Sequence, residues 1–123
     1  MAKIALLIGM GEYQSELPAL PGTRHDIECL ERVLKSPHVG AFDEGTCLSN
    51  PDRIQMELAI ERLFTQNRQR DDWVLLYFSG HGIKAGDGQL YLASSNTQLD
   101  VEGEVYRSTE VTTNFDSSIF SGS

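Results

Sequence analysis

The stretch 73–82 constrains the fold most, because six consecutive apolar residues end abruptly in the sequence Ser-Gly-His-Gly. An apolar run with aromatic and β-branched members is typical of a strand buried on both faces, as in the middle of a parallel sheet. In open α/β sheets, ligands bind beyond the carboxyl ends of the strands. The sequence therefore places His81 on the functional edge of a sheet rather than in its core.

The segments before this stretch alternate between strand and helix patterns. Residues 3–8 form a second continuous apolar run, and residues 43–48 form a weaker strand pattern. Apolar residues at helical spacing predict one helix from about Gly22 to Lys35 and another from Asn50 to about residue 67. Asn50 is expected to be the N-cap of the second helix, with Pro51 at the first helical position. This order predicts an α/β fold with right-handed parallel crossovers.

The segments after His81 are shorter and more polar. Residues 83–85 and 89–92 predict a β-hairpin, with a glycine-rich turn at 86–88. Residues 94–123 are predicted to be an irregular tail.

Charge and composition limit the partners and the compartment. The net charge of −8 argues against nucleic acid and against an anionic membrane surface, and suits a cationic ligand or partner. No apolar run approaches the ~20 residues of a transmembrane helix, and the first apolar run is too short for a signal peptide. We therefore expect a cytoplasmic protein. Cys29 and Cys47 lack any metal-ligand spacing, so both are expected to be free, buried thiols, and no metal site is predicted.

His81 is the candidate functional histidine, whereas His25 and His38 are interpreted as structural or solvated. The glycines on both sides of His81 allow another backbone or a ligand to approach closely. An imidazole in this position could act as a general acid and base, as a metal ligand, or as the group that deprotonates a thiol. The local sequence alone leaves these roles open.

Three segments together resemble a known family. They are Ala-Leu-Leu-Ile-Gly at 5–9, Leu-Pro-Gly-Thr-Arg-His-Asp at 20–26, and Tyr-Phe-Ser-Gly-His-Gly at 77–82. The chain resembles the first half of caspase-like cysteine peptidases over residues 3–113, with the metacaspase and bacterial caspase-like branch as the closest group. The resemblance implies a caspase-like three-layer sandwich with a mostly parallel central sheet, here incomplete. Residues 1–123 would be the N-terminal part of a single catalytic domain that lacks the cysteine-bearing strand.

The resemblance also implies roles for individual residues. His81 would form a dyad with a cysteine from the next strand, and the Gly82 N–H would contribute to the oxyanion hole. Asp26 and Ser79 match positions that line the substrate pocket, where a carboxylate favours arginine or lysine before the cut. True caspases carry an arginine at the position of Leu20, so an aspartate preference is not supported. The resemblance implies protein or peptide substrates and no obligatory cofactor. Some metacaspases need calcium, but the later acids form no readable calcium site: Asp100, Glu102 and Glu104.

The chain departs from the family pattern in its cysteines. In caspases the histidine precedes the cysteine by ~50 residues, whereas Cys29 and Cys47 both precede His81 and no cysteine follows it. Either the remaining C-terminal part or a separate chain supplies the cysteine, or this is an inactive relative that serves as a signalling or scaffolding module. Residues 116–122 echo the family's cysteine motif with serines in place of cysteines, which favours the second interpretation. A flavodoxin-like small-ligand binder is a third interpretation.

Overall fold

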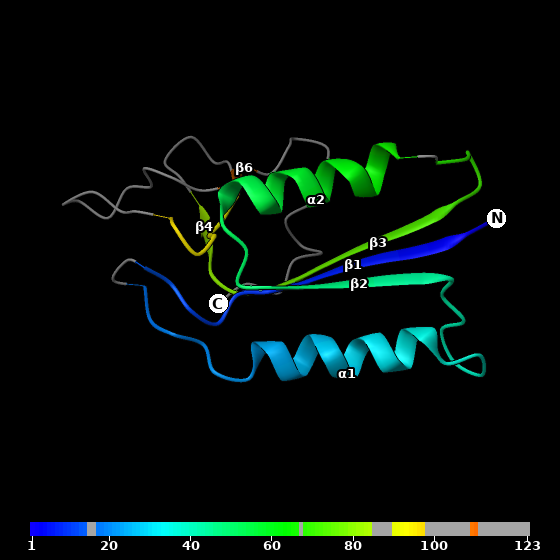
Figure 1. Cartoon of the computed structure of the whole chain (residues 1–123), viewed down its shortest axis with the longest axis horizontal. Helices are drawn as coiled ribbons and strands as arrows, with labels where there is room; N and C mark the ends of the chain where they lie inside the picture. Colours follow the sequence, from blue (N-terminus) through cyan, green and yellow to red (C-terminus); the bar gives the residue numbers. More distant parts are fainter. Residues whose placement is uncertain (15–16, 67, 85–89, 98–108, 111–123) are drawn as a thin grey trace.

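A three-stranded parallel sheet forms the centre of the fold. The computed structural model describes residues 1–14, 17–66, 68–84, 90–97 and 109–110. The sheet has the order β2-β1-β3, with β1 at Lys3–Gly9, β2 at Glu44–Ser49 and β3 at Trp73–Ser79. Helices α1 (Thr23–Lys35) and α2 (Arg53–Thr65) cover opposite faces of this sheet (Figure 1). The predicted α/β class and layered arrangement are therefore confirmed.

The chain order explains why the helices lie on opposite faces. β1 is parallel to both β2 and β3, and α1 connects β1 to β2 while α2 connects β2 to β3. The second crossover passes back over β1 in the direction opposite to the first. Two crossovers in opposite directions have the same hand only if their helices lie on opposite faces, as they do here. The predicted parallel crossovers are thus present.

β1 supplies the core on both faces of the sheet. Its alternate residues Ile4, Leu6 and Ile8 pack with Met56 and Leu63 on the α2 side. Ala5 and Leu7 pack with Ile27 on the α1 side. Strand side chains alternate between faces, so a strand covered by helices on both sides must be apolar at every position. The continuous apolar run in β1 meets this requirement.

The predicted strand at 73–78 is present and packs apolar residues on both of its faces, but the prediction that it lies in the middle of the sheet is wrong for the described sheet. β1 occupies the central position, and β3 pairs only with β1 within the described residues. Only Phe78 is fully buried in β3, and Trp73 is 60% exposed. A run of apolar residues identifies a strand, but its length does not distinguish a central strand from one at the side of a sheet.

The start of α2 also differs from the prediction. The N-cap is Asp52 and not Asn50, and the helix begins at Arg53. Asp52 Oδ1 accepts the Gln55 N–H at 2.8 Å, and Gln55 Oε1 accepts the Asp52 N–H at 3.0 Å, which completes a capping box. The helix ends at Thr65, close to the predicted end, which falls on residue 67 outside the described residues.

Asn50 serves another purpose. It adopts a positive φ of 52°, and its Oδ1 accepts the N–H groups of Gly11 and Glu12 at 2.8 and 3.0 Å. Asparagine tolerates this left-handed backbone conformation better than most residues. The side chain therefore ties the loop after β1 to the end of β2.

A second, antiparallel sheet lies beyond the carboxyl ends of the first. It has the order β4-β5-β6, with β4 at Gly82–Lys84, β5 at Leu90–Leu92 and β6 at Thr109–Glu110 (Figure 1). The predicted hairpin is confirmed in its two strands, while its turn at 86–88 lies outside the described residues. β6 is an element that the sequence analysis does not predict, since it falls within the predicted tail. The serine echo at 116–122 and the acids Asp100, Glu102 and Glu104 also lie outside the described residues.

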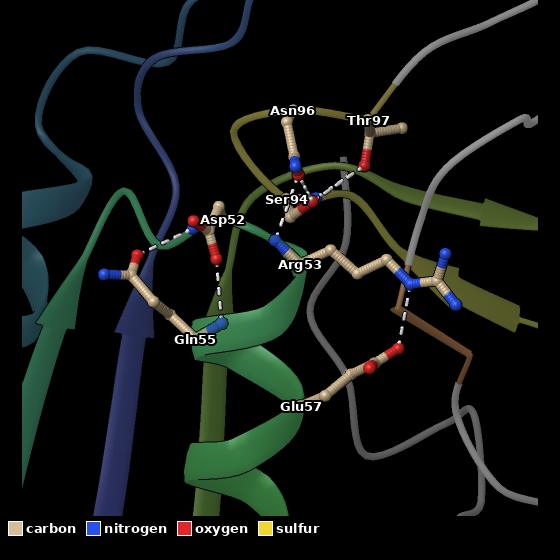
Figure 2. A network of polar contacts seen from close by, with 7 residues as sticks. All are labelled: Asp52, Arg53, Gln55, Glu57, Ser94, Asn96 and Thr97. Atoms are coloured by element: carbon tan, nitrogen blue, oxygen red, sulfur yellow. Dashed lines mark hydrogen bonds and ion pairs between the residues drawn. The ribbon is translucent and has the colours of Figure 1, made fainter.

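A polar loop joins this second sheet to α2. Asn96 Oδ1 accepts the Arg53 N–H at 3.0 Å and the Ser94 hydroxyl at 2.8 Å. Thr97 Oγ1 accepts a hydrogen bond from the Ser94 N–H at 2.7 Å. Ser94 and Thr97 are both fully buried. Figure 2 shows this loop above the first turn of α2, next to the capping box. Each buried hydroxyl has a partner, as buried polar groups require.

Among the described residues, no helix combines the length and the apolar character needed to cross a lipid bilayer.

We expect Asp52→Ala to lower the free energy of unfolding by about 1 kcal/mol, because the Gln55 N–H loses its acceptor and the capping box opens. Asp52→Asn retains a side-chain oxygen and is the matched control, with a much smaller loss. Urea unfolding at constant m-value measures both changes. An alanine variant with the wild-type midpoint would show that this capping box does not stabilise α2.

Candidate active site

Three strand ends meet at one edge of the parallel sheet. Gly9, the last residue of β1, is in register with Ser49 of β2 and with Ser79 of β3. The loops that leave these strands therefore start side by side. His81 lies two residues after the end of β3, and the loop 10–22 follows β1. This edge is where the sequence predicts the functional site, and it brings these two loops into contact.

His81 is held from three directions. Its N–H donates to the Tyr13 hydroxyl at 2.9 Å, and its carbonyl accepts the Ala93 N–H at 3.0 Å. The ring nitrogen Nε2 lies 2.9 Å from the Pro18 carbonyl oxygen. The residue is half-buried, so the ring is neither enclosed in the apolar core nor fully solvated.

The Pro18 contact determines the form of the imidazole. A carbonyl oxygen can only accept a hydrogen bond, so Nε2 must carry a proton and donate it. In the neutral ring, the lone pair is then on Nδ1. The Pro18 carbonyl thus orients the ring, with Nε2 toward the loop after β1.

Tyr13 packs against the same imidazole. The two ring centroids are 5.1 Å apart, with an interplanar angle of 51°. Burial raises the pKa of the Tyr13 phenol above its ordinary value, and the hydrogen bond from the His81 N–H lowers it by less. Tyr13 is therefore a neutral hydroxyl that accepts the backbone N–H of His81.

Gly80 makes this close packing feasible. A Cβ atom at Gly80 would lie 2.7 Å from the Cβ of Met10 and 2.9 Å from the Tyr13 hydroxyl oxygen. Real Cβ atoms do not approach other atoms so closely, so any side chain here would displace Tyr13 from His81. The sequence predicts that the glycines beside His81 allow another segment to approach closely. At Gly80 this segment is the loop after β1, with Met10 and Tyr13.

Gly82 has its N–H directed away from the hairpin. Gly82 is paired with Leu92, and the Ala93 N–H donates to the His81 carbonyl. In an antiparallel ladder this pattern makes Gly82 and Leu92 a non-hydrogen-bonded pair, whose own N–H groups point away from each other's strand. The Gly82 N–H therefore lies on the outer side of β4, next to His81 in sequence.

Ser79 and Asp26 lie on the α1 side of this edge. Leu75 and Tyr77 of β3 pack against α1, so strand alternation puts the half-buried Ser79 side chain on the same face. The first turn of α1 reaches the strand ends, since a Cβ at Gly9 would lie 3.0 Å from the Thr23 carbonyl oxygen. Asp26 is exposed in that first turn. The fold thus brings both predicted pocket residues to the edge that carries His81.

Neither cysteine is paired with His81. Cys29 Sγ lies 3.4 Å from His25 Nε2 on α1, and Cys47 Sγ lies 3.7 Å from the Ile27 carbonyl oxygen. Both thiols are free, as expected, but half-buried, so the expectation of buried thiols is wrong. Within the described residues, no group of three histidine, cysteine or acidic side chains could hold a metal ion.

The sequence analysis missed Tyr13 and Pro18 because both lie in a loop without periodicity, far from His81 in sequence. The sequence feature that could have pointed to them is an aromatic residue and a proline shortly after a strand that ends in glycine. Nothing in the neighbouring sequence links these residues to His81.

A family model described as the caspase domain, Peptidase_C14, matches residues 2–121 of the chain. The match includes every described strand and helix, and it covers the segments on which the resemblance was based. No curated protein matches the chain.

We expect Tyr13→Phe to lower the free energy of unfolding by about 1–2 kcal/mol at pH 7, because the partly buried His81 N–H loses its acceptor. The imidazole signals of His81 in NMR spectra should shift as well. Tyr77→Phe, which changes a half-buried tyrosine on the α1 face, is the matched control and should leave the His81 signals in place.

The difference between wild type and Tyr13→Phe should also depend on pH. A phenol whose pKa is raised on folding contributes stability that is present below about pH 10, the ordinary tyrosine value, and is lost as the pH rises through the higher folded value. The two unfolding free energies should therefore converge in alkaline solution. A difference that stays constant between pH 7 and pH 11 would contradict the assignment.

Proposed function

Because the chain belongs to the caspase domain family of cysteine peptidases, we propose that it is the histidine-bearing part of an endopeptidase that cleaves after arginine or lysine. Membership of this family implies protein substrates. The observation that carries the proposal is the orientation of His81, whose Nε2–H donates to the Pro18 carbonyl, so that the lone pair of the neutral ring is on Nδ1. The free thiols fit a reducing compartment, and we place the protein in the cytoplasm.

On this proposal, His81 acts as the general acid and base. A cysteine supplied by the remaining C-terminal part or by a separate chain passes its thiol proton to Nδ1 of His81 and attacks the peptide carbonyl as a thiolate. The imidazole protonates the leaving amine, and then removes a proton from the water that hydrolyses the acyl-enzyme. The neutral ring accepts protons at Nδ1 while Pro18 keeps Nε2–H in place.

The Gly82 N–H is the donor that we assign to the oxyanion. Its direction away from β5 supports this role, since a donor committed to the hairpin ladder could not bind a substrate oxygen. A backbone donor of this kind is already oriented when negative charge develops on the carbonyl oxygen.

Asp26 is the group that we assign to the basic residue of the substrate, with Ser79 at the same edge of the sheet, on the face that α1 covers. The Asp26 side chain is exposed, so a guanidinium or ammonium group of a substrate can reach it from solvent without any rearrangement of the core. Charge-assisted hydrogen bonds to a carboxylate are about twice as strong as neutral ones. With Leu20 at the position where caspases carry an arginine, we place the chain nearer the metacaspase branch.

We expect His81→Ala to reduce kcat/KM on arginyl and lysyl peptides by about 100-fold or more, because the general acid and base is lost. The assay uses the protein expressed together with the segment that follows Ser123 and its cysteine. His38→Ala is the matched control, because His38 lies in the turn after α1 at the opposite end of the sheet. Equal activity of the two variants would refute the role of His81.

We expect Asp26→Asn to lower kcat/KM on arginyl peptides by at least about tenfold, because one charge-assisted interaction is lost. Asp71→Asn removes the same charge from an exposed position just before β3, at the far end of the sheet, and should leave the rate unchanged. A uniform loss in both variants would assign the effect to net charge and not to a pocket.

An inactive binding module is the second candidate, and it rests on the positions of the cysteines. The Cys29 thiol contacts His25 on α1, and the Cys47 thiol contacts the Ile27 carbonyl of α1. Neither thiol is bonded to His81. A reading frame that continues into an apolar strand followed by a cysteine supports the enzyme, whereas a stop codon directly after Ser123 and no co-purifying chain support the module.

A further inference from the structure

A thiol and an imidazole lie next to each other on α1, outside the proposed catalytic site. Cys29 Sγ is 3.4 Å from His25 Nε2, one helical turn away. His25 is exposed and Cys29 is half-buried, so both can be reached by a small molecule in solution. A thiol that can pass its proton to a neighbouring imidazole is a better nucleophile than an isolated one.

Charges of both signs lie next to Cys29 on the surface of α1. On the helix surface, residues three and four positions away are its neighbours, which are His25, Asp26, Arg32 and Val33. The guanidinium of Arg32 offsets the carboxylate of Asp26, and the neutral imidazole of His25 adds no charge.

Cys47 offers a contrast within the same chain. Its Sγ points toward the Ile27 carbonyl oxygen, between β2 and α1. Burial, followed by the carboxylates of Glu31 and Glu28, raises the pKa of the Cys47 thiol. This thiol is kept protonated and partly covered, so it should react slowly.

We propose that Cys29, paired with His25, is a modification site that forms a mixed disulfide with low-molecular-weight disulfides such as glutathione disulfide. The Cys29 proton passes to His25, and the resulting thiolate attacks one sulfur of the small disulfide. The bond between the two small sulfurs breaks, a bond from Cys29 Sγ to the attacked sulfur forms, and the other sulfur leaves as a thiolate that takes up a proton. The small disulfide is the oxidant, so no further reactant is needed. The site is independent of the peptidase proposal, since neither residue contacts His81.

The test uses the whole chain with glutathione disulfide at pH 7, followed by peptide mapping in a mass spectrometer, which reports the two thiols separately. We expect Cys29 to be modified at least about tenfold faster than Cys47. His25→Gln should slow the modification of Cys29 several-fold, about threefold or more, and leave the rate at Cys47 unchanged. His38→Gln, which removes an exposed histidine elsewhere, is the matched control and should change neither rate.

Two outcomes would overturn the proposal. One is a wild-type chain in which Cys47 reacts as fast as Cys29 or faster, a comparison that requires no variant. The other is a folded His25→Gln variant, with the wild-type circular dichroism spectrum, in which Cys29 reacts at the wild-type rate.

Discussion

The central position of β1 is the constraint on which the rest of the structure depends. β1 pairs in parallel with β2 on one side and β3 on the other, and it is covered by a helix on each face. Parallel pairing aligns the carboxyl ends of all three strands at Gly9. Each loop that leaves the sheet there is forced to start beside the others, so residues distant in sequence meet at one edge. The candidate site therefore depends on this alignment as well as on the local sequence around His81.

Polar ties then fix the loops at this edge. Asn50 accepts two N–H groups of the loop after β1, and the Gln14 N–H donates to the Ser95 carbonyl at 2.8 Å. The Ser95 N–H in turn donates to the Pro51 carbonyl at 2.9 Å, so the loops after β1, β2 and β5 are bonded in series. These backbone groups are satisfied by protein partners, which helps to hold Tyr13 in contact with His81.

The sequence predicted those parts of the structure that depend on local pattern. The apolar run of β1, the helical spacing of α1 and the glycines around His81 each specify a conformation through neighbouring residues. The predictions were wrong where contacts between residues far apart in sequence determine the structure. Asn50 and Asp52 are both suitable N-caps. Asp52 takes this position because the Asn50 side chain accepts hydrogen bonds from the N–H groups of Gly11 and Glu12 instead. The central place of β1 and the contacts of Tyr13 and Pro18 depend in the same way on pairings that no local pattern contains.

On the proposed function, the geometry at His81 also limits where a nucleophile can come from. Nε2 is bonded to Pro18, so a sulfur that exchanges its proton with the ring must approach the side that carries Nδ1. Cys29 and Cys47 do not meet this condition, since their sulfurs are directed at His25 and at the Ile27 carbonyl. The described residues thus provide an acid and base, an N–H donor and a carboxylate, but not the sulfur. Peptidase chemistry at this edge requires a sulfur from a second component, and the same edge without it would bind a basic peptide and leave it intact. The two proposed functions therefore differ in whether a cysteine thiol reaches His81, while the fold that orients His81 is common to both.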